Sequence, residues 1–161
     1  MVKMYVCSLE DFYRKVVAYK KKGIRVSLAI GGWNDSLGDK YSRLVNSPAA
    51  RSRFVQHVVK FLKEYDFDGL DFDWEYPKCW QVNCASGPAS DKQGFADLVK
   101  ELRAAFRPHG WLLSAAVSPS KVVIDEGTSA FRFVEPTGKE FRTVSPPNAD
   151  EVFVQLFKSL D

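Results

Sequence analysis

The sequence predicts an α/β domain in which one sheet of parallel strands is packed against helices. Two observations lead to this prediction: segments with apolar residues at helical spacing, and short β-branched runs that alternate with them along the chain. Such alternation forms right-handed βαβ units, which build both doubly wound sheets and closed (β/α)₈ barrels. The 161 residues are enough for one domain, and 45% are hydrophobic, so a sizeable core can form.

The first helix is expected to begin after Ser8, which forms a capping box with Asp11, and to end at Gly23. Its apolar side chains share one face: Leu9, Phe12, Tyr13, Val16 and Val17. Residues 24–30 (IRVSLAI) follow as a β-branched run between glycines, which predicts a buried strand.

Two further helices each lead into a strand. Ser47 and Pro48 are a favourable N-cap and first-turn pair, so the second helix is expected to start there. The acid-rich segment after it predicts a strand at about 67–74. Ser90 opens the third helix, which precedes a strand at 111–117 (WLLSAAV).

Charge and cysteine content restrict the class of protein. A formal net charge of +3 is too small to predict binding to nucleic acid or to an anionic membrane. No apolar run approaches the roughly 20 residues of a membrane-spanning helix, and no signal peptide is visible. Cys79 and Cys84 lie close together; a disulfide, which would imply an oxidising compartment, and two free thiols both fit this spacing.

Residues 66–77 (DFDGLDFDWEYP) combine acidic and large apolar side chains in one predicted strand. Because alternate side chains of a strand share a face, Asp71, Asp73 and Glu75 should form a row with Cα atoms about 6.6 Å apart. The opposite face would carry Leu70, Phe72 and Trp74. Neighbouring carboxylates repel one another, so some must be protonated or neutralised, as in a general acid.

A metal site or a charged edge strand could also produce a row of acids. Three ligands along one strand face lie too far apart to encircle Mg²⁺ or Ca²⁺ at about 2.0–2.6 Å. An edge strand would carry lysine and avoid large apolar residues on its other face. General acid–base chemistry is therefore favoured, with Glu75 at the carboxyl end of the strand, where parallel sheets place their active groups.

Three segments resemble glycoside hydrolase family 18, the chitinases and their relatives. DGLDFDWE (68–75) is similar to the family motif D-G-x-D-x-D-x-E, LAIGGW (28–33) resembles its S-x-G-G strand, and SAAVSPS (114–120) resembles its fifth barrel strand. The stretch after the acids, YPKCWQVNCASGPASDK, is most similar to catalytic domains of multidomain arthropod chitinases. The resemblance covers about residues 8–121.

The resemblance implies a fragment of a (β/α)₈ TIM barrel, with about three central strands and their helices, from an enzyme that hydrolyses chitin with retention. Glu75 would be the general acid, and the substrate's own N-acetyl oxygen would attack the anomeric carbon. Asp73 would orient the acetamido group, and Asp71 would share a proton with Asp73. No cofactor and no metal is implied. The parent enzyme would be extracellular, and its partner would be chitin or a chito-oligosaccharide.

Aromatic residues near the acids are candidates for sugar contacts. Trp33 and Tyr76 are expected to bind substrate, whereas Trp80 fits loop packing equally well. Two alternatives to a chitinase stay open: a non-catalytic chitin-binding protein and an α/β enzyme that uses the acid row for Mg²⁺. The acid at Glu75 favours an enzyme over a lectin, because family members that only bind sugar typically lack it.

The chain departs from the family pattern in two ways. Ala29 occupies the position of the serine in S-x-G-G, which should have a mild effect. The first two and the later barrel strands are not found, so residues 8–121 are expected to be a partial catalytic domain and residues 122–161 a divergent tail of unknown structure. A barrel cut to three strands has unpaired edges, so the chain alone is expected to be a weak or inactive chitinase.

Overall fold

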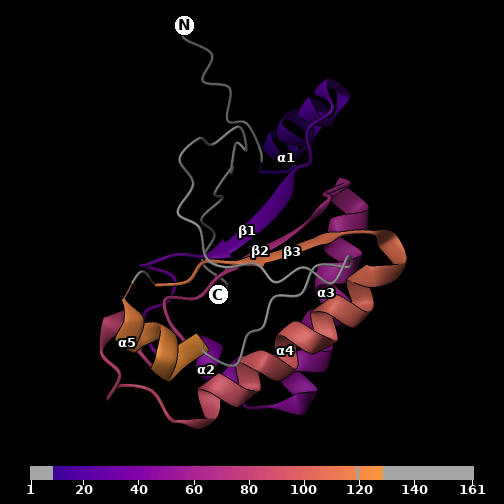
Figure 1. Ribbon diagram of the computed structural model, residues 1–161. Helices are drawn as coiled ribbons and strands as arrows, with labels where there is room; N and C mark the ends of the chain where they lie inside the picture. Colours follow the sequence, from indigo (N-terminus) through magenta and orange to yellow (C-terminus); the bar gives the residue numbers. More distant parts are fainter. Residues whose placement is uncertain (1–8, 119, 129–161) are drawn as a thin grey trace, which may run out of the picture.

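The structure is a computed structural model that describes residues 9–118 and 120–128. Figure 1 shows helices α2, α3 and α4 on one side of a twisted sheet. Its elements are, in order, α1 (Leu9–Val17), η1 (Ala18–Lys22), β1 (Ser27–Gly31), α2 (Lys40–Val45), α3 (Pro48–Tyr65), β2 (Gly69–Asp73), η2 (Trp80–Val82), α4 (Ser90–Phe106), η3 (Arg107–His109), β3 (Leu112–Ala115), α5 (Lys121–Val123) and η4 (Ile124–Thr128).

The three strands form one parallel sheet in the order β1-β2-β3, so the predicted α/β class and strand direction are confirmed. The central strand β2 carries the acids. In the register of the sheet, Asp71 lies opposite Ala29 of β1 and Ser114 of β3. Within the described residues, β1 and β3 each pair along one edge only.

The predicted helix starts agree with the structure wherever the residues are described. Ser47 is the N-cap of α3, and its side chain accepts a hydrogen bond from the Ala50 amide at 3.3 Å, with Pro48 in the first turn. α4 begins at Ser90, but Ala89 occupies the N-cap position and makes no side-chain capping bond. The predicted capping residue Ser8 lies outside the described residues.

The strands are shorter than predicted, and one helix was not predicted. The run 24–30 forms a strand only from Ser27, and the run 111–117 only over Leu112–Ala115. The six-residue α2 has too few turns to give a periodic signal. None of the helices among the described residues is long and apolar enough to cross a membrane.

The hydrophobic core lies between the sheet and the helices. Leu70, Phe72 and Trp74 are each at most 1% exposed, which confirms the predicted apolar face of β2. The Phe72 ring centroid lies 5.3 Å from that of Tyr41 and 5.4 Å from that of Phe95. The other buried members of the core are Tyr13, Val17, Val26, Leu28, Val45, Val58, Leu62, Phe67, Leu98, Leu102 and Phe106.

Tyr41 is expected to make the folded protein less stable at alkaline pH. Burial raises the pKa of its hydroxyl, and the hydrogen bond to Asp35 at 2.5 Å raises it further. Because the pKa is raised on folding, this contribution to stability is complete below the unfolded-state pKa of about 10 and is lost as the pH rises above it. The unfolding free energy of the unmodified protein should fall as the pH rises above 10. In Tyr41→Phe this slope should be less steep, by up to about 1.4 kcal/mol per pH unit. Urea unfolding from pH 8 to 11 measures this slope; equal slopes for both proteins would contradict the assignment.

Candidate active site

The three acids lie at the carboxyl end of β2 and just beyond it. Asp71 is partly buried, and Asp73, the last residue of the strand, is only 4% exposed. Alternation along β2 places Asp71 and Asp73 on the face opposite Phe72, which packs into the core on the helix side. Glu75 follows in a bend beyond the end of β2 and is partly buried. The place of Glu75 in the row of acids stays a prediction.

Asp71 is held from one neighbouring strand. The Ser114 hydroxyl on β3 donates a hydrogen bond to Asp71 Oδ1 at 2.7 Å. On the other side, the register places Ala29 next to Asp71, and its methyl group cannot donate. Ser114 therefore makes the contact to Asp71 that a serine at position 29 could make from β1.

Removing this hydroxyl should destabilise the protein. Ser114→Ala is expected to lower the unfolding free energy by about 1.5–3 kcal/mol, because a partly buried carboxylate loses a hydrogen bond. Adding Ala29→Ser should recover part of the loss, since position 29 faces Asp71 in the sheet. Urea unfolding of the three variants tests this, with the exposed Ser90→Ala as a control expected within about 0.5 kcal/mol of the parent. A Ser114→Ala variant as stable as that control would contradict the role of Ser114.

The backbone around Glu75 is fixed by Ser36, which was not predicted as a site residue. Ser36 is completely buried, and its Oγ accepts a hydrogen bond from the Glu75 amide at 2.9 Å. The same hydroxyl lies 3.4 Å from the Asp73 carbonyl, to which it donates. The loop after β1 therefore holds the segment that carries Asp73 and Glu75.

The glycines after β1 let this loop approach β2. The Gly32 amide donates to the Asp73 carbonyl at 2.7 Å. At Gly31, which has a φ of +109°, a Cβ would lie 2.1 Å from the same carbonyl oxygen. No side chain fits there, so the close approach of the two strands requires a glycine at position 31.

Tyr76 lies beside Glu75, and its ring is buried. Burial raises the pKa of the Tyr76 hydroxyl, and the charge and hydrogen bond of Glu75 raise it further, while a hydrogen bond with Ser118 lowers it. The charge of Asp73 also raises the pKa of Tyr76. At 8% exposure the ring offers little face for stacking.

The two tryptophans have different surroundings. Trp33 follows β1 and is 46% exposed, so one ring face is open at the carboxyl end of the sheet. Its carbonyl accepts a hydrogen bond from Gln81 Nε2 at 2.8 Å. Trp80 is partly buried and donates from Nε1 to Asp91 Oδ2 at 2.9 Å, which supports the loop-packing alternative.

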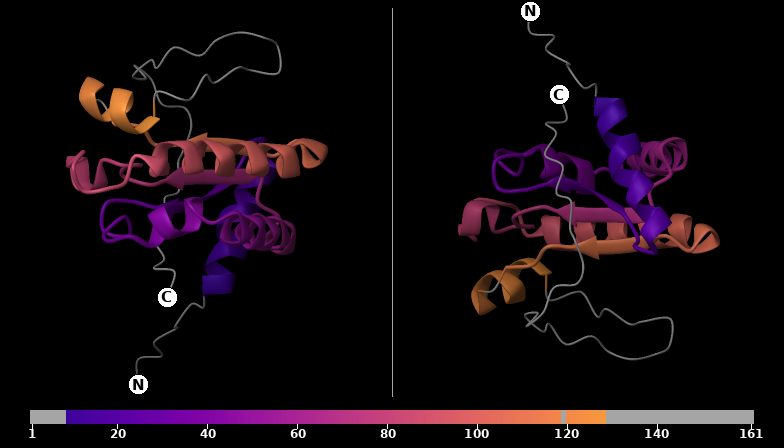
Figure 2. Two further views of the ribbon diagram at one scale, coloured as in Figure 1. Left: turned by 90° about the horizontal axis from the view of Figure 1, so that it is seen from below. Right: turned by 90° about the horizontal axis from the view of Figure 1, so that it is seen from above.

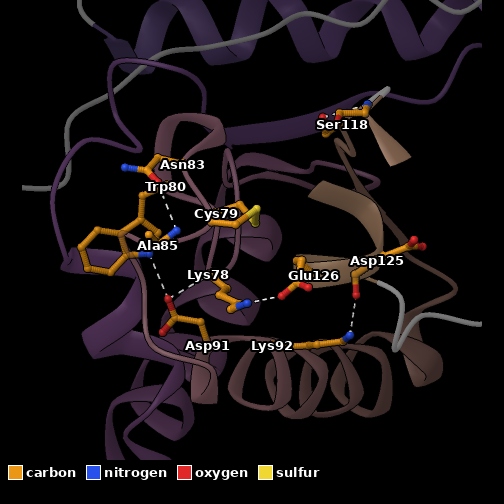
Figure 3. The surroundings of a disulfide bond; sticks show 12 residues. Lys78, Cys79, Trp80, Asn83, Ala85, Asp91, Lys92, Ser118, Asp125 and Glu126 are labelled. Carbon is orange, nitrogen blue, oxygen red and sulfur yellow. Dashed lines mark hydrogen bonds and ion pairs between the residues drawn. A yellow bond between two sulfur atoms is a disulfide. The ribbon is translucent and has the colours of Figure 1, made fainter. Parts of the chain in front are cut away.

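The loop after Glu75 is closed by a disulfide between Cys79 and Cys84, so the bonded alternative is the one that the structure contains. Figure 3 shows this disulfide between Trp80 and the segment that carries Glu126. Cys79 is completely buried, and with Tyr76 and Val123 it forms a small second core. Lys78 is ion-paired with Glu126, so residues 121–128 are attached to the loop.

The arrangement suits acid–base chemistry on a ligand at the carboxyl end of the sheet. It supplies a partly buried carboxyl group at Glu75, a buried one at Asp73 and an exposed indole at Trp33, all at the carboxyl ends of neighbouring strands. In residues 9–118 and 120–128, no group of three or more His, Cys, Asp or Glu side chains is placed to hold a metal ion.

Comparisons with known proteins show the family to which the chain belongs. The sequence model of the family described as "Glycosyl hydrolases family 18" matches residues 5–158, which extends beyond residue 121. Over 116 residues, or 72% of the chain, the sequence is 65% identical to "Probable chitinase 10" of Drosophila melanogaster. It is 44% identical to "Endochitinase" of Manduca sexta over 106 residues, or 65% of the chain.

A similar solved structure is a mutant of Ostrinia furnacalis Group II chitinase catalytic domain 2, in complex with penta-N-acetylchitooctaose. It is 64% identical with a TM-score of 0.73, over 76% of this chain and 32% of that chain. The chain spans 5% of the Drosophila relative and 18% of the Manduca relative. A partial barrel of parallel strands fits these neighbours. The chain belongs to glycosyl hydrolase family 18.

Proposed function

We propose that this chain is part of a chitinase catalytic domain that hydrolyses β-1,4-linked N-acetylglucosamine polymers. The observation that supports this most is the acid row on one face of β2, which ends in Glu75 with its backbone held by Ser36. The complex of the Ostrinia relative with a chito-oligosaccharide supports the same substrate class. Hydrolase and chitinase relatives support the reaction class.

Glu75 would protonate the glycosidic oxygen of the bond that is cleaved. It is partly buried at the end of the sheet, where a sugar chain could reach it, and Tyr76 lies next to its carboxyl group. A general acid must reach the leaving oxygen within hydrogen-bonding distance. The fixed backbone on both sides of Glu75 favours such a placement.

The nucleophile that displaces the leaving group would be the substrate's own N-acetyl group. Its oxygen would attack the anomeric carbon as the glycosidic bond breaks, and water would then open the resulting oxazolinium with retention. Asp73, buried beside Glu75, would orient the acetamido N–H and balance the positive charge that develops. Asp71 would share a proton with Asp73 as a coupled pair, with Ser114 fixing one of its oxygens.

Trp33 and Tyr76 would contact the sugars in different ways. The exposed indole of Trp33 would stack on a pyranose ring. The buried Tyr76 would act through its hydroxyl, beside the acid. Residues 8–121 would supply this part of the catalytic domain, and residues 122–161 would be a divergent tail, of which Glu126 is ion-paired with Lys78 of the loop after Glu75.

The parent enzyme would be extracellular and longer than this chain. The disulfide between Cys79 and Cys84 supports an oxidising compartment. Because the described sheet has three strands with one unpaired edge on each outer strand, we expect residues 1–161 alone to be weakly active or inactive. The three-stranded sheet with its unpaired edges also favours a second candidate function, a chitin-binding protein without catalysis.

The experiment compares turnover with binding. Residues 1–161 and a longer product of the same reading frame are assayed on a fluorogenic chitotrioside and for retention on chitin beads. The proposed function predicts turnover in the longer chain, whereas retention without turnover in both chains supports the binding protein. A chitotrioside analogue with free amines in place of the N-acetyl groups tests the mechanism, because it lacks the attacking oxygen. Turnover of this analogue at the rate of the acetylated substrate would exclude the substrate-assisted reaction.

A further inference from the structure

Asp91 is a buried carboxylate at the start of α4 that no part of the proposed reaction uses. It is completely buried and accepts hydrogen bonds at both oxygens. Ser42 Oγ and Asn46 Nδ2 donate to Oδ1 at 2.5 and 2.7 Å. The Lys78 amide and Trp80 Nε1 donate to Oδ2 at 3.3 and 2.9 Å. One carboxylate thus connects α2 and α4 to the loop after Glu75 (Figure 3).

The surroundings of Asp91 direct hydrogen-bond donors at both of its oxygens. The Lys78 amide and the Trp80 indole can only donate, and both reach Oδ2, while Asn46 donates from Nδ2 to Oδ1. An asparagine at position 91 could keep an acceptor on one side only, and its NH₂ group turned toward the loop would meet two donors. The position in the first turn of a 17-residue helix also favours a negative charge.

The loop that Asp91 holds returns to Glu75. Two residues before Trp80, Lys78 is fixed by its amide on Asp91 and by its carbonyl, which accepts from the Gly87 amide at 2.9 Å. One residue after Trp80, the Gln81 amide donates to the Glu75 carbonyl at 3.2 Å. The contacts of Lys78 and Trp80 with Asp91 therefore fix the chain on both sides of Cys79. Gln81, the next residue, in turn fixes the Glu75 carbonyl.

Gly87 shows how closely this loop is packed around the carboxylate. A Cβ at Gly87 would lie 2.6 Å from Trp80 Nε1 and 2.8 Å from Asp91 Oδ2. The space beside the Trp80–Asp91 hydrogen bond is therefore filled by the loop backbone itself. A second attachment of the loop, the ion pair of Lys78 with Glu126, involves a Glu126 side chain that is 48% exposed and does not replace the buried one. In the two views of Figure 2, α5 lies at the same end of the sheet as the loop that follows β2.

We propose that Asp91 is a positioning residue for Glu75: its buried carboxylate fixes the loop at Lys78 and Trp80, and the loop fixes the Glu75 backbone through Gln81. The Ser36 hydroxyl holds the amide of Glu75, and the Asp91-anchored loop holds its carbonyl. The acid is thus restrained on both sides, once from the loop after β1 and once from α4. The catalytic consequence rests on the proposed function, but the structural consequence does not.

Asp91→Asn is the direct test, with Asp97→Asn as its matched control. Asp97 lies on the same helix, and its side chain is 37% exposed, with a hydrogen bond from Gln93 Nε2 at 2.8 Å and ion pairs at 3.9 and 4.0 Å. Both variants lose one negative charge from α4, and only the first touches the loop. We expect hydrogen exchange of the Lys78 and Gln81 amides to become about 10- to 100-fold faster in Asp91→Asn, and to stay unchanged in Asp97→Asn.

Trp80→Phe is the second variant, since Asp91→Asn could unfold the chain. It keeps an aromatic ring and the charge of Asp91 but removes one donor. We expect faster exchange at Gln81 with unchanged exchange in α3. In the unmodified protein, the Trp80 indole proton should give a downfield resonance, and Asp91→Asn should shift it. Unchanged exchange at Gln81 in both variants, or an equal increase throughout α3, would overturn the proposal.

Kinetics separate positioning from general stability. In a chain that shows turnover, Asp91→Asn should lower kcat for the chitotrioside by at least about tenfold, with a smaller change in KM. Asp97→Asn should change neither. Absence of turnover in the longer chain would count against the proposed function, whereas the exchange of Lys78 and Gln81 would still decide the role of Asp91. A kcat of Asp91→Asn equal to that of Asp97→Asn would overturn the proposal.

Discussion

Glu75→Gln is expected to reduce turnover of a fluorogenic chitotrioside by about 10²- to 10⁴-fold, the usual contribution of a general acid. Glutamine has nearly the same size and can keep contact with the Tyr76 hydroxyl, but its amide cannot give a proton to the leaving oxygen. The Glu75 backbone bonds to Ser36 and Gln81 do not involve the side chain, so the fold should survive. The binding of chito-oligosaccharides should therefore change little.

The measurement combines initial rates with a binding assay. Turnover is measured in the shortest chain that shows it, and affinity for a chito-oligosaccharide is measured by calorimetry. Glu64→Gln is the control, because Glu64 is exposed on α3 and its loss removes the same charge far from the acid row. Unchanged turnover in Glu75→Gln would remove Glu75 from the reaction. A loss of turnover together with a loss of binding would instead point to a role in holding the substrate.

The period of the sequence predicted the parallel sheet and the buried face of β2 for simple physical reasons. Alternation along residues 70–75 decides which side chains face the helices, and burial of Leu70, Phe72 and Trp74 fixes that face. Ser47 and Pro48 begin α3 through contacts within one turn, which the local sequence contains. Features that depend on neighbours a few residues apart were therefore accessible from the sequence.

The residues that hold the acids were not predicted, because their contacts join distant parts of the chain. Ser36 is 39 residues from Glu75, Ser114 is 43 residues from Asp71, and Ser42 is 49 residues from Asp91. Nothing in a local pattern distinguishes these serines from exposed ones. The register of the sheet does place position 114 beside position 71, so a correct strand alignment could have identified Ser114.

The roles of Trp80 and the cysteines also depend on contacts that a local sequence pattern does not show. The sequence left sugar contact and loop packing equally open for Trp80, since the answer depends on Asp91, 11 residues away in a helix. The spacing of Cys79 and Cys84 allowed both a disulfide and two free thiols. They are bonded because the loop between them folds back and brings the two sulfur atoms together. The domain boundary expected near residue 121 remains a prediction, although residues 121–128 contact the loop through Glu126.

Gly31→Ala is expected to have the largest effect on stability of any single methyl addition at the site. Its Cβ would lie 2.1 Å from the Asp73 carbonyl oxygen and 2.6 Å from the carbonyl carbon. These are backbone atoms of the paired strand, so no side-chain rotation can relieve the contact. The φ of +109° is also unfavourable for alanine. We expect the unfolding free energy to fall by more than about 4 kcal/mol, as for the most damaging substitutions.

Gly38→Ala separates the close contact from the backbone conformation. Gly38 also has a positive φ, +76°, but a Cβ there would have no atom within 4 Å. It should therefore lose only the conformational cost of about 1–2 kcal/mol, and the difference between the two variants measures the approach of β1 to β2. Urea unfolding of both variants gives this difference, and circular dichroism shows whether Gly31→Ala still folds. Equal losses of unfolding free energy in the two variants would mean that β1 can move away from Asp73. The loop after β1 would then not fix the acids, because the Gly32 amide and the Ser36 hydroxyl contact the Asp73–Glu75 backbone only while β1 and β2 stay this close.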